Sequence, residues 1–344
     1  MIEVRFAAVC VDIAETGGRA ILGQSGEANM RRLDREDHNL RAALDWSLAN
    51  DEAGLGLRIL GAIWRWFQQR GRLREARALL AQLLASPSRG DIRIRISGLA
   101  AEGGLAYWMN DFPAARVAYE ERLGLASMTG DQILEADAHY DLGFLSAVTQ
   151  EGELLRAHEQ LALDLYEAAG YEAGAIRARQ ALVLAVFLAG DYATALELEH
   201  LNLEVFRRTG SQFQIADSMT LQSGVYWRMG DPATSWLRVS DALRFFWDTD
   251  SASGLARALG MAAIIQISNG DGELGARIAG ATYRLIREKG VMLAPVTVLH
   301  LPDPAELAAG RFGAERAAEL LAEGEAIPIE EVVAEVLARP SLAS

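Results

Sequence analysis

The stretch that decides the fold is residues 171–210, YEAGAIRARQALVLAVFLAGDYATALELEHLNLEVFRRTG. Two segments of helical length with apolar periodicity flank a turn at residues 189–192. The first segment contains the nine consecutive apolar residues 181–189, too few to span a bilayer but typical of a helix that is packed on both sides. Because neither helix can bury its apolar surface alone, the stretch predicts one helix hairpin in a stack of similar hairpins.

Glycines spaced by 40 residues or a multiple of 40 predict the boundaries between hairpins, because glycine adopts a left-handed backbone after a helix end without a side-chain clash. The boundary residues are Gly90, Gly130, Gly170, Gly210 and Gly290, with Asp250 in the remaining position. A second series marks the turn inside each hairpin, and in most hairpins an acidic residue follows that could cap the next helix: Gly71, Asn110, Gly152, Gly190, Gly230 and Gly270. Five residues later stands a small residue, predicted to let the two helices cross closely: Ala76, Ala115, Ala157, Ala195, Ser235 and Gly275.

These patterns predict an all-α protein, a right-handed α-solenoid of six helix hairpins with repeats of about 40 residues. The hairpins occupy residues 51–290. Residues 1–50 form an N-terminal helical segment with helices near residues 4–15 and 30–49. Residues 291–344 form a loop and a C-terminal helical cap, with short helices near 305–310, 314–323 and 329–337.

Composition restricts the partners of this chain of 344 residues. Its net charge is −14 and Lys289 is its only lysine, which argues against direct binding of nucleic acid, where neutralisation of phosphates supplies most of the affinity. Cys10 is the only cysteine, so an internal disulfide is excluded. We find no signal peptide and no membrane segment, and we expect a cytoplasmic protein without a membrane partner.

Motifs for catalysis and cofactors are weak. Residues 270–275 match G-x-G-x-x-G, but they coincide with the hairpin turn of the other units, which favours a turn over a dinucleotide site. Because Lys289 is the only lysine, there is no G-x-x-x-x-G-K-[ST] phosphate loop. The five histidines lie far apart in the sequence, with no pair at helical spacing. We therefore predict no enzyme activity, no metal site and no cofactor.

The predicted binding surface is the concave face of the stack, lined by the first helix of each hairpin. Corresponding positions on these helices combine charged, polar and aromatic side chains, a mixture that binds a polar or anionic ligand by charged hydrogen bonds and stacking. The predicted contact residues are Arg58, Tyr107, Trp108, His139, Arg177, Gln180, Asp217, Trp227, Arg228 and Arg257. In the alternative interpretation the aromatic rings pack between hairpins and the arginines are solvated. Trp64, Trp66 and Phe67 are predicted to belong to the core.

Four phrases carry a resemblance to known families. Residues 33–46, LDREDHNLRAALDW, together with LREAR at 73–77, resemble the sensor region of large bacterial signal-transducing ATPases with numerous domains. These include maltose-activator-like and LuxR-type regulators, antibiotic-pathway activators and cyclase fusions. Residues 322–332, AEGEAIPIEEV, are similar to the end of that region, and GDYATA at 190–195 resembles the inter-helix turn of tetratricopeptide repeats. The resemblance spans nearly the whole chain.

The resemblance implies a non-catalytic sensor or protein-interaction module of a bacterial signal-transduction or transcriptional regulator. The implied partner is the ATPase or output domain of a regulator, a small polar effector, or both. This chain contains the motifs of neither an ATPase module nor an output domain. The alternative is a scaffold that joins proteins, or its own copies as a homodimer, through its edges without a small ligand.

Overall fold

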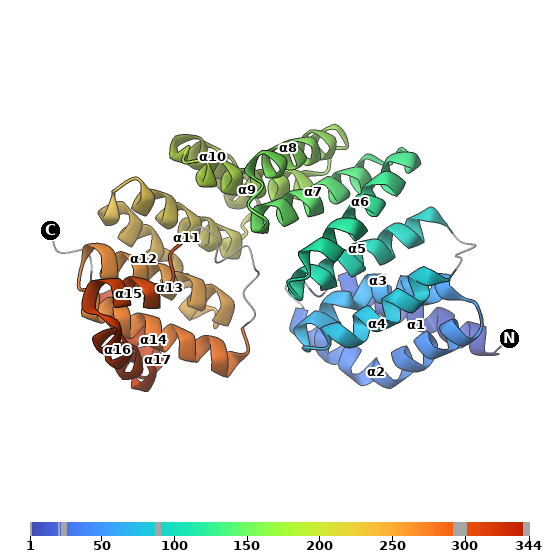
Figure 1. Cartoon of the computed structure of the whole chain (residues 1–344), viewed down its shortest axis with the longest axis horizontal. Coiled ribbons are helices and arrows are strands. Elements are labelled where there is room, and N and C mark those ends of the chain that lie inside the picture. The colour runs from blue at the N-terminus through green and yellow to red at the C-terminus, as the bar shows by residue number, and fades with distance from the viewer. Residues whose placement is uncertain (1, 20, 22–25, 87–90, 292–300, 340–344) are drawn as a thin grey trace. The chain divides into compact units, whose positions relative to one another are not determined.

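The computed structural model describes residues 2–19, 21, 26–86, 91–291 and 301–339, and these residues form helices and turns without any strand (Figure 1). This confirms the predicted all-α solenoid of helix hairpins. Two N-terminal helices, α1 (Ile2–Arg19) and α2 (Gly26–Ala49), precede the hairpins. Three C-terminal helices, α15 (Pro304–Phe312), α16 (Ala314–Ala326) and α17 (Ile329–Ala338), follow them. Among all the described residues, no helix is both long and apolar enough to cross a membrane.

Six hairpins lie between these ends, as the glycine spacing predicts. They are α3 (Ala53–Gln69) with α4 (Leu73–Ala85), α5 (Ile92–Trp108) with α6 (Phe112–Thr129), α7 (Gln132–Val148) with α8 (Gly152–Ala168), α9 (Glu172–Leu188) with α10 (Tyr192–Thr209), α11 (Gln212–Arg228) with α12 (Pro232–Asp248), and α13 (Ala252–Asn269) with α14 (Gly272–Lys289). The chain falls into two compact units, residues 1–178 and 179–344, that divide within α9. The domain limits predicted at residues 50 and 290 therefore lie inside these units.

In unit 1 the N-terminal helices complete the core of the first hairpin. Trp66 and Phe67 are buried there, as predicted, together with Leu33 and Leu40 of α2. The Trp66 indole also donates a hydrogen bond of 2.9 Å to the Asp34 carboxylate, so α2 is attached to α3 by polar as well as apolar contacts. This segment shields an end of the hairpin stack that would otherwise expose apolar surface.

In unit 2 the C-terminal helices cover α13 and α14. The core contains the buried rings of Trp236 and Phe246 and the buried valines of α17. The Trp236 indole donates a hydrogen bond of 2.9 Å to the Arg339 carbonyl, directly after α17. Arg284 of α14 donates hydrogen bonds to the carbonyls of Glu325 and Ile327 at 2.6 and 2.7 Å. These contacts close the second end of the chain with a helical cap.

The boundary glycines have the backbone that their spacing predicts. Gly130, Gly170, Gly210 and Gly290 have φ values of +67, +65, +71 and +61°, and Asp250 takes the same region with φ +49°. Gly90 lies outside the described residues. The aspartates after the hairpin turns cap the next helix, since the carboxylates of Asp111, Asp191, Asp231 and Asp271 each accept a hydrogen bond of 3.0–3.3 Å from the backbone N–H three residues on.

The third hairpin corrects one predicted turn. The left-handed residue is Gln150, with φ +61°, and Glu151 precedes α8, whereas Gly152 is already the first helical residue. The buried position five residues after the turn is therefore Leu155. Ala157, the small residue predicted where the two helices cross, is exposed. A glycine near the turn made the wrong register attractive, although the residue in the left-handed position is a glutamine.

Candidate ligand-binding site

Two glycines in α5 let large rings lie against the helix backbone in unit 1. A Cβ atom on Gly104 would lie 2.6 Å from the Cη2 atom of Trp64, and one on Gly103 would lie 2.2 Å from Cε1 of Tyr119. Both distances are shorter than any tolerable carbon–carbon contact. Glycine inside a helix costs about 1 kcal/mol relative to alanine, and here it allows the rings of α3 and α6 to pack closely on α5.

An ion pair connects the first helices of two successive hairpins. Arg177 of α9 donates hydrogen bonds of 3.1 Å to the Asp137 carboxylate of α7 and 3.2 Å to the Tyr166 hydroxyl. Tyr166 in turn donates a short hydrogen bond to Asp137. The Arg177 guanidinium lies 5.1 Å from the centre of the Tyr140 ring, within cation–π range. The side chains of Asp137 and Arg177 remain 28% and 44% exposed.

Asp141 lies one turn further along α7 and is paired with a buried arginine. Arg122 of α6 donates a short hydrogen bond to the Asp141 carboxylate and one of 2.9 Å to the Asp137 carbonyl. Burial raises the pKa of Asp141, although the charge of Arg122 opposes the rise. Because the Asp141 side chain nevertheless keeps 26% of its exposure, water reaches a carboxylate that protein atoms largely surround.

Arg65 of α3 completes the group. Its guanidinium lies 4.3 Å from the centre of the Trp64 ring. Burial lowers the pKa of Arg65. The charge of Asp141 and the tyrosines Tyr119 and Tyr140 oppose this by raising the pKa, whereas the charge of Arg177 lowers it further. Among the described residues it makes no hydrogen bond and no ion pair. We call Arg65, Arg122, Asp137, Asp141 and Arg177 the arginine–aspartate cluster.

Glu159 of α8 lies close to this cluster without joining its hydrogen bonds. Its side chain is fully buried, and neither carboxyl oxygen has a hydrogen-bond partner. The space that it occupies exists because residue 143 is glycine, since a Cβ atom there would lie 2.4 Å from Oε1 of Glu159. Burial raises the pKa of Glu159 well above its ordinary value, with the charge of Asp141 acting in the same direction. Burial therefore favours the protonated, uncharged form of the Glu159 carboxyl group.

The predicted contact residues of unit 1 have different surroundings. Arg177 belongs to the arginine–aspartate cluster. The ring of Tyr107 is buried, and its centre lies 6.1–6.2 Å from the centres of Trp108, Phe112 and Phe144, as the packing alternative described. Arg58 forms an ion pair of 2.7 Å with Glu15 of α1, so the N-terminal segment neutralises its charge.

His139 contacts another histidine, although the five histidines lie far apart in the sequence without a pair at helical spacing. Its Nδ1 atom lies 2.9 Å from Nδ1 of His158, and the ring centroids are 5.2 Å apart. The two residues are on antiparallel helices of one hairpin, so helical spacing in the sequence could not reveal the pair. The rings face each other nearly head-on through these nitrogens, which suits one proton shared between them and leaves too little room for a metal ion.

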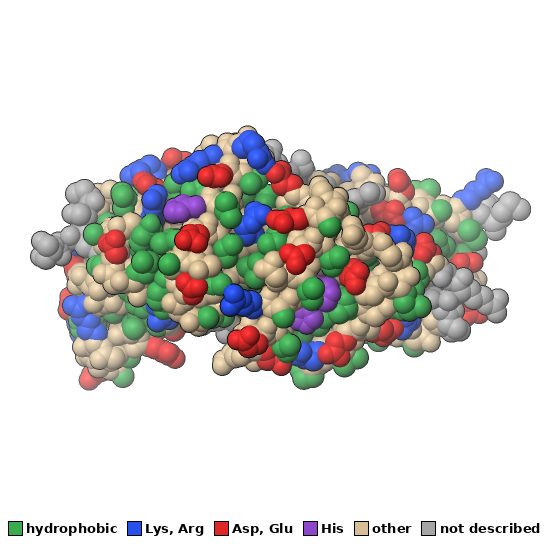
Figure 2. Space-filling view, turned by 90° about the horizontal axis from the view of Figure 1, so that it is seen from above, with side chains coloured by type: hydrophobic (Ala, Val, Ile, Leu, Met, Phe, Trp, Pro, Cys, Tyr) green, Lys and Arg blue, Asp and Glu red, His purple; other side chains and the backbone are tan. Residues whose placement is uncertain are grey.

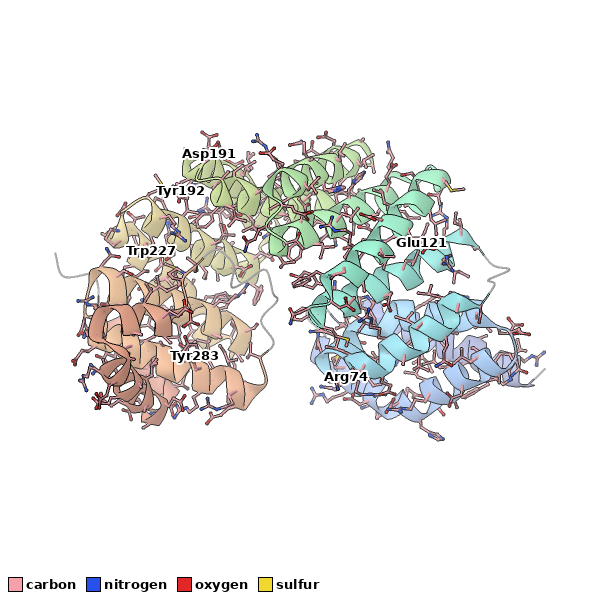
Figure 3. All side chains as sticks on the ribbon, in the orientation of Figure 1. Arg74, Glu121, Asp191, Tyr192, Trp227 and Tyr283 are labelled. Atoms are coloured by element: carbon pink, nitrogen blue, oxygen red, sulfur yellow. The ribbon has the colours of Figure 1, made fainter. Side chains whose placement is uncertain are left out.

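In unit 2 the predicted residues mainly contact one another or the core. Arg257 forms an ion pair of 2.5 Å with Asp217, and each side chain is about 30% exposed. Trp227, labelled in Figure 3, donates a hydrogen bond of 3.1 Å from its indole to Asn269 and lies beneath the Arg228 guanidinium at 5.0 Å. Gln180 is half-buried on α9.

The repeat of 40 residues is the signal that could have found the missed residues. Subtracting 40 from Arg177 gives Asp137, and subtracting 40 from Arg257 gives Asp217; both are ion pairs. The predicted set of corresponding positions instead contained Arg58 and His139. These residues lie one and two positions away from the nearest members of the series with a period of 40. Arg65 and Asp141 have no comparable signal, because only the packing of three hairpins brings them together.

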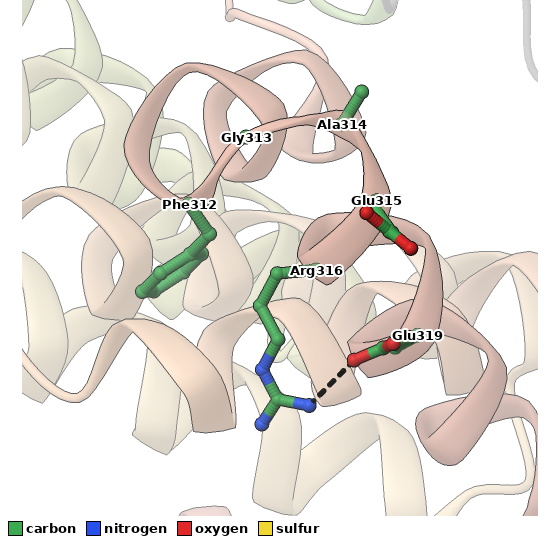
Figure 4. A pocket seen from close by; sticks show the side chains of 6 residues that line it. All are labelled: Phe312, Gly313, Ala314, Glu315, Arg316 and Glu319. Atoms are coloured by element: carbon green, nitrogen blue, oxygen red, sulfur yellow. Dashed lines mark hydrogen bonds and ion pairs between the residues drawn. The ribbon is translucent and has the colours of Figure 1, made fainter.

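Unit 2 contains a surface depression. A depression of about 370 Å³ between α15 and α16 is lined by Phe312, Gly313, Ala314, Glu315, Arg316 and Glu319 (Figure 4). It holds an ion pair of 3.0 Å between Arg316 and Glu319, and none of the predicted contact residues. On the face shown in Figure 2, acidic and basic side chains alternate among apolar ones, without an extended basic area.

No family model and no curated protein matches this chain. Solved structures of helical-repeat proteins are similar to it. A Rap protein complexed with competence and sporulation factor has a TM-score of 0.60 at 14% identity, covering 97% of this chain and 96% of that chain. The Rap conjugation gene regulator of plasmid pLS20, in complex with the Phr* peptide, has a TM-score of 0.55 at 10% identity, covering 93% and 98%.

A third similar structure is a signal transduction ATPase with numerous domains from Pyrococcus horikoshii, which has a tetratricopeptide repeat sensor. Its TM-score is 0.57 at 15% identity, and the match covers 84% of this chain and 47% of that chain. At identities this low, the three similarities establish the fold alone: an all-α helical repeat of the tetratricopeptide type.

Proposed function

We propose that this protein is a non-catalytic recognition module that binds a polypeptide segment of a partner protein, or a small polar effector, at the arginine–aspartate cluster of unit 1. The observation that carries the proposal is the cluster itself. Charged groups of four helices converge there, remain partly exposed, and are held by hydrogen bonds and by rings packed on glycine. Fixed polar groups held among aromatic rings can recognise a ligand without any catalytic residue.

The similar structures support a binding role. One of them contains the competence and sporulation factor, and another contains the Phr* peptide. Repeat proteins of this kind use the surface of their stacked helices for recognition. Polypeptide ligands therefore take precedence over small effectors in the proposal.

We place this module in a bacterial signal-transduction or transcriptional regulator, as a cytoplasmic protein whose partner is an ATPase or output domain. Support comes from the phrases at residues 33–46 and 322–332 and from the similar structure with a repeat sensor. The net charge of −14 disfavours direct contact with nucleic acid. A ligand that prefers one arrangement of the hairpins would shift the population toward it and so change the docking of the partner.

A scaffold role is the second candidate. Large apolar side chains are exposed on the second helices of several hairpins, with exposed fractions of 66% for Val117, 47% for Leu161, 50% for Leu201 and 53% for Leu237. Exposed apolar side chains can mark sites of association. Light scattering over a range of concentrations tests this role, which predicts a dimer that Val117→Ser with Leu161→Ser weakens.

Thermal-shift measurements with peptides, sugars and nucleotides test the main proposal, because a ligand that binds only the folded protein raises the melting temperature. We expect a peptide to produce a shift in the natural protein that disappears in Arg177→Ala. Arg257→Ala is the matched control, since it removes the equivalent ion pair of unit 2. Shifts that persist in Arg177→Ala, or vanish equally in both variants, would refute binding at the cluster.

A further inference from the structure

We infer that Arg65 is the anion-binding residue of this site and that the ligand presents a carboxylate group to it. This inference rests on the proposed function, because it specifies the chemistry of a ligand bound at the arginine–aspartate cluster. It is carried by the different pairing of the three cluster arginines. Arg122 is paired with Asp141 and Arg177 with Asp137, whereas Arg65 has no hydrogen-bond or ion-pair partner among the described residues and lies over the Trp64 ring.

The charge balance of the cluster points the same way. Three guanidinium groups face two carboxylates, and the full burial of the neighbouring Glu159 disfavours a third negative charge. The cluster therefore carries about one excess positive charge in a chain whose net charge is −14. A single anionic group balances it.

The cost of leaving Arg65 unpaired gives the ligand its binding energy. Arginine keeps its proton in proteins, so burial cannot neutralise it as it can neutralise a carboxyl group. A guanidinium that has lost water without gaining a carboxylate is poorly compensated. Because charges interact more strongly where protein replaces water, an anion placed here gains more than it would at an exposed arginine.

A carboxylate fits better than a phosphate. The Trp64 ring lies against the guanidinium, whose planar fork of paired N–H donors matches the two oxygens of a carboxylate. Asp141 lies close enough to act on Arg65. Its negative charge would repel the second charge of a phosphate dianion, whereas a monoanion leaves the cluster neutral. The rings of Tyr119 and Tyr140 nearby suit an acidic residue with apolar neighbours.

Three fluorescent hexapeptides, acetylated and amidated at their ends, provide the test. They alternate phenylalanine with glutamate, glutamine or phosphoserine, and their binding is measured by fluorescence anisotropy. We expect the glutamate peptide to bind best. Arg65→Gln should weaken its binding roughly tenfold, and Arg65→Lys should restore part of the loss because it keeps the charge without the planar edge.

Arg93→Gln is the charge-matched control, since Arg93 lies half-exposed on α5 in an ion pair with Asp131. Arg65→Gln should also melt at the temperature of the natural protein or above it, because it removes an unpaired charge. Equal binding of the glutamate and glutamine peptides, equal losses in Arg65→Gln and Arg93→Gln, or no binding of any peptide would overturn the inference. If Arg177→Ala abolishes binding while Arg65→Gln does not, the proposed function stands and only the carboxylate assignment fails.

Discussion

Glu159 and Glu199 occupy the same position on the second helices of successive hairpins, 40 residues apart, and both are fully buried. In unit 1 the Glu159 carboxyl group has no hydrogen-bond partner. In unit 2 Glu199 accepts a short hydrogen bond from Ser218 and one of 3.4 Å from Asn202, and Arg179 donates to Asn202 at 3.3 Å. Burial, with the charge of Asp141, raises the pKa of Glu159 well above its ordinary value, whereas these donors limit the rise that burial causes for Glu199 to about 7.

The comparison shows that equivalent positions of the repeat can share the same residue and the same burial while the hydrogen-bond partners around the side chain differ. Both units also contain an aspartate–arginine pair between first helices, Asp137 with Arg177 and Asp217 with Arg257. In unit 1 the pair is accompanied by several tyrosines and by Arg65, which has no hydrogen-bond or ion-pair partner among the described residues. We therefore propose that equivalent positions support recognition in unit 1 and packing in unit 2.

The largest expected effect is the pH dependence contributed by Glu199. Its pKa is raised from 4.5 to about 7, so the folded protein binds the proton more tightly and the free energy of unfolding falls as pH rises through this window. The loss amounts to about 3 kcal/mol at 1.4 kcal/mol per pH unit. Glu199→Gln should remove this contribution to the slope seen in urea denaturation between pH 5 and 8. The exposed Glu197→Gln on the same helix should keep it; equal slopes in both variants would contradict the prediction.

Glycine substitutions in first helices should have opposite signs in the two units. Gly103→Ala should lower the free energy of unfolding by about 2 kcal/mol, because the new methyl group meets the buried Tyr119 ring. Gly260→Ala in α13 should raise it by up to about 1 kcal/mol, since no atom lies within 4 Å and alanine favours the helix. Chemical denaturation measures both. Stabilisation by Gly103→Ala would show that the rings of unit 1 are not held by the glycines of α5.

The turns of the third and fourth hairpins offer a smaller contrast. Gln150 and Gly190 have φ values of +61 and +82°, where only glycine is unstrained. We expect Gln150→Gly to raise the free energy of unfolding by up to about 1 kcal/mol and Gly190→Ala to lower it by about the same amount. Thermal denaturation decides between this register and a turn at Gly152, which predicts no gain from Gln150→Gly.

The two ion pairs should differ in function more than in stability. Because their side chains are partly exposed, Arg177→Ala and Arg257→Ala should each cost about 0.5 kcal/mol. Double-mutant cycles with Asp137→Ala and Asp217→Ala measure the coupling, and salt should weaken both. Loss of ligand binding is expected for Arg177→Ala alone. A large loss of stability in that variant would instead make the pair of unit 1 a structural contact.

Errors in the sequence-based site came from register. The glycine series placed the hairpins correctly, but Gly152 shifted the third turn by two residues, so His139 stood where the structure has Asp137. The same period applied to Arg177 would have indicated the partner aspartate. Arg65 gave no signal, because an arginine next to Trp64 in an apolar helix is equally compatible with core packing and with exposure.

The sequence by itself determined the helices, their pairing into hairpins and their caps. These depend on apolar periodicity, left-handed glycines and capping aspartates, which act over a few residues. Only the tertiary structure decided which charged side chains form ion pairs and that Arg65 has no hydrogen-bond or ion-pair partner among the described residues. It also decided that Glu159 and Glu199 differ in their hydrogen-bond partners. Those outcomes depend on side chains from three or four helices converging in one place, and the balance between lost water and gained hydrogen bonds is set there, not along the chain.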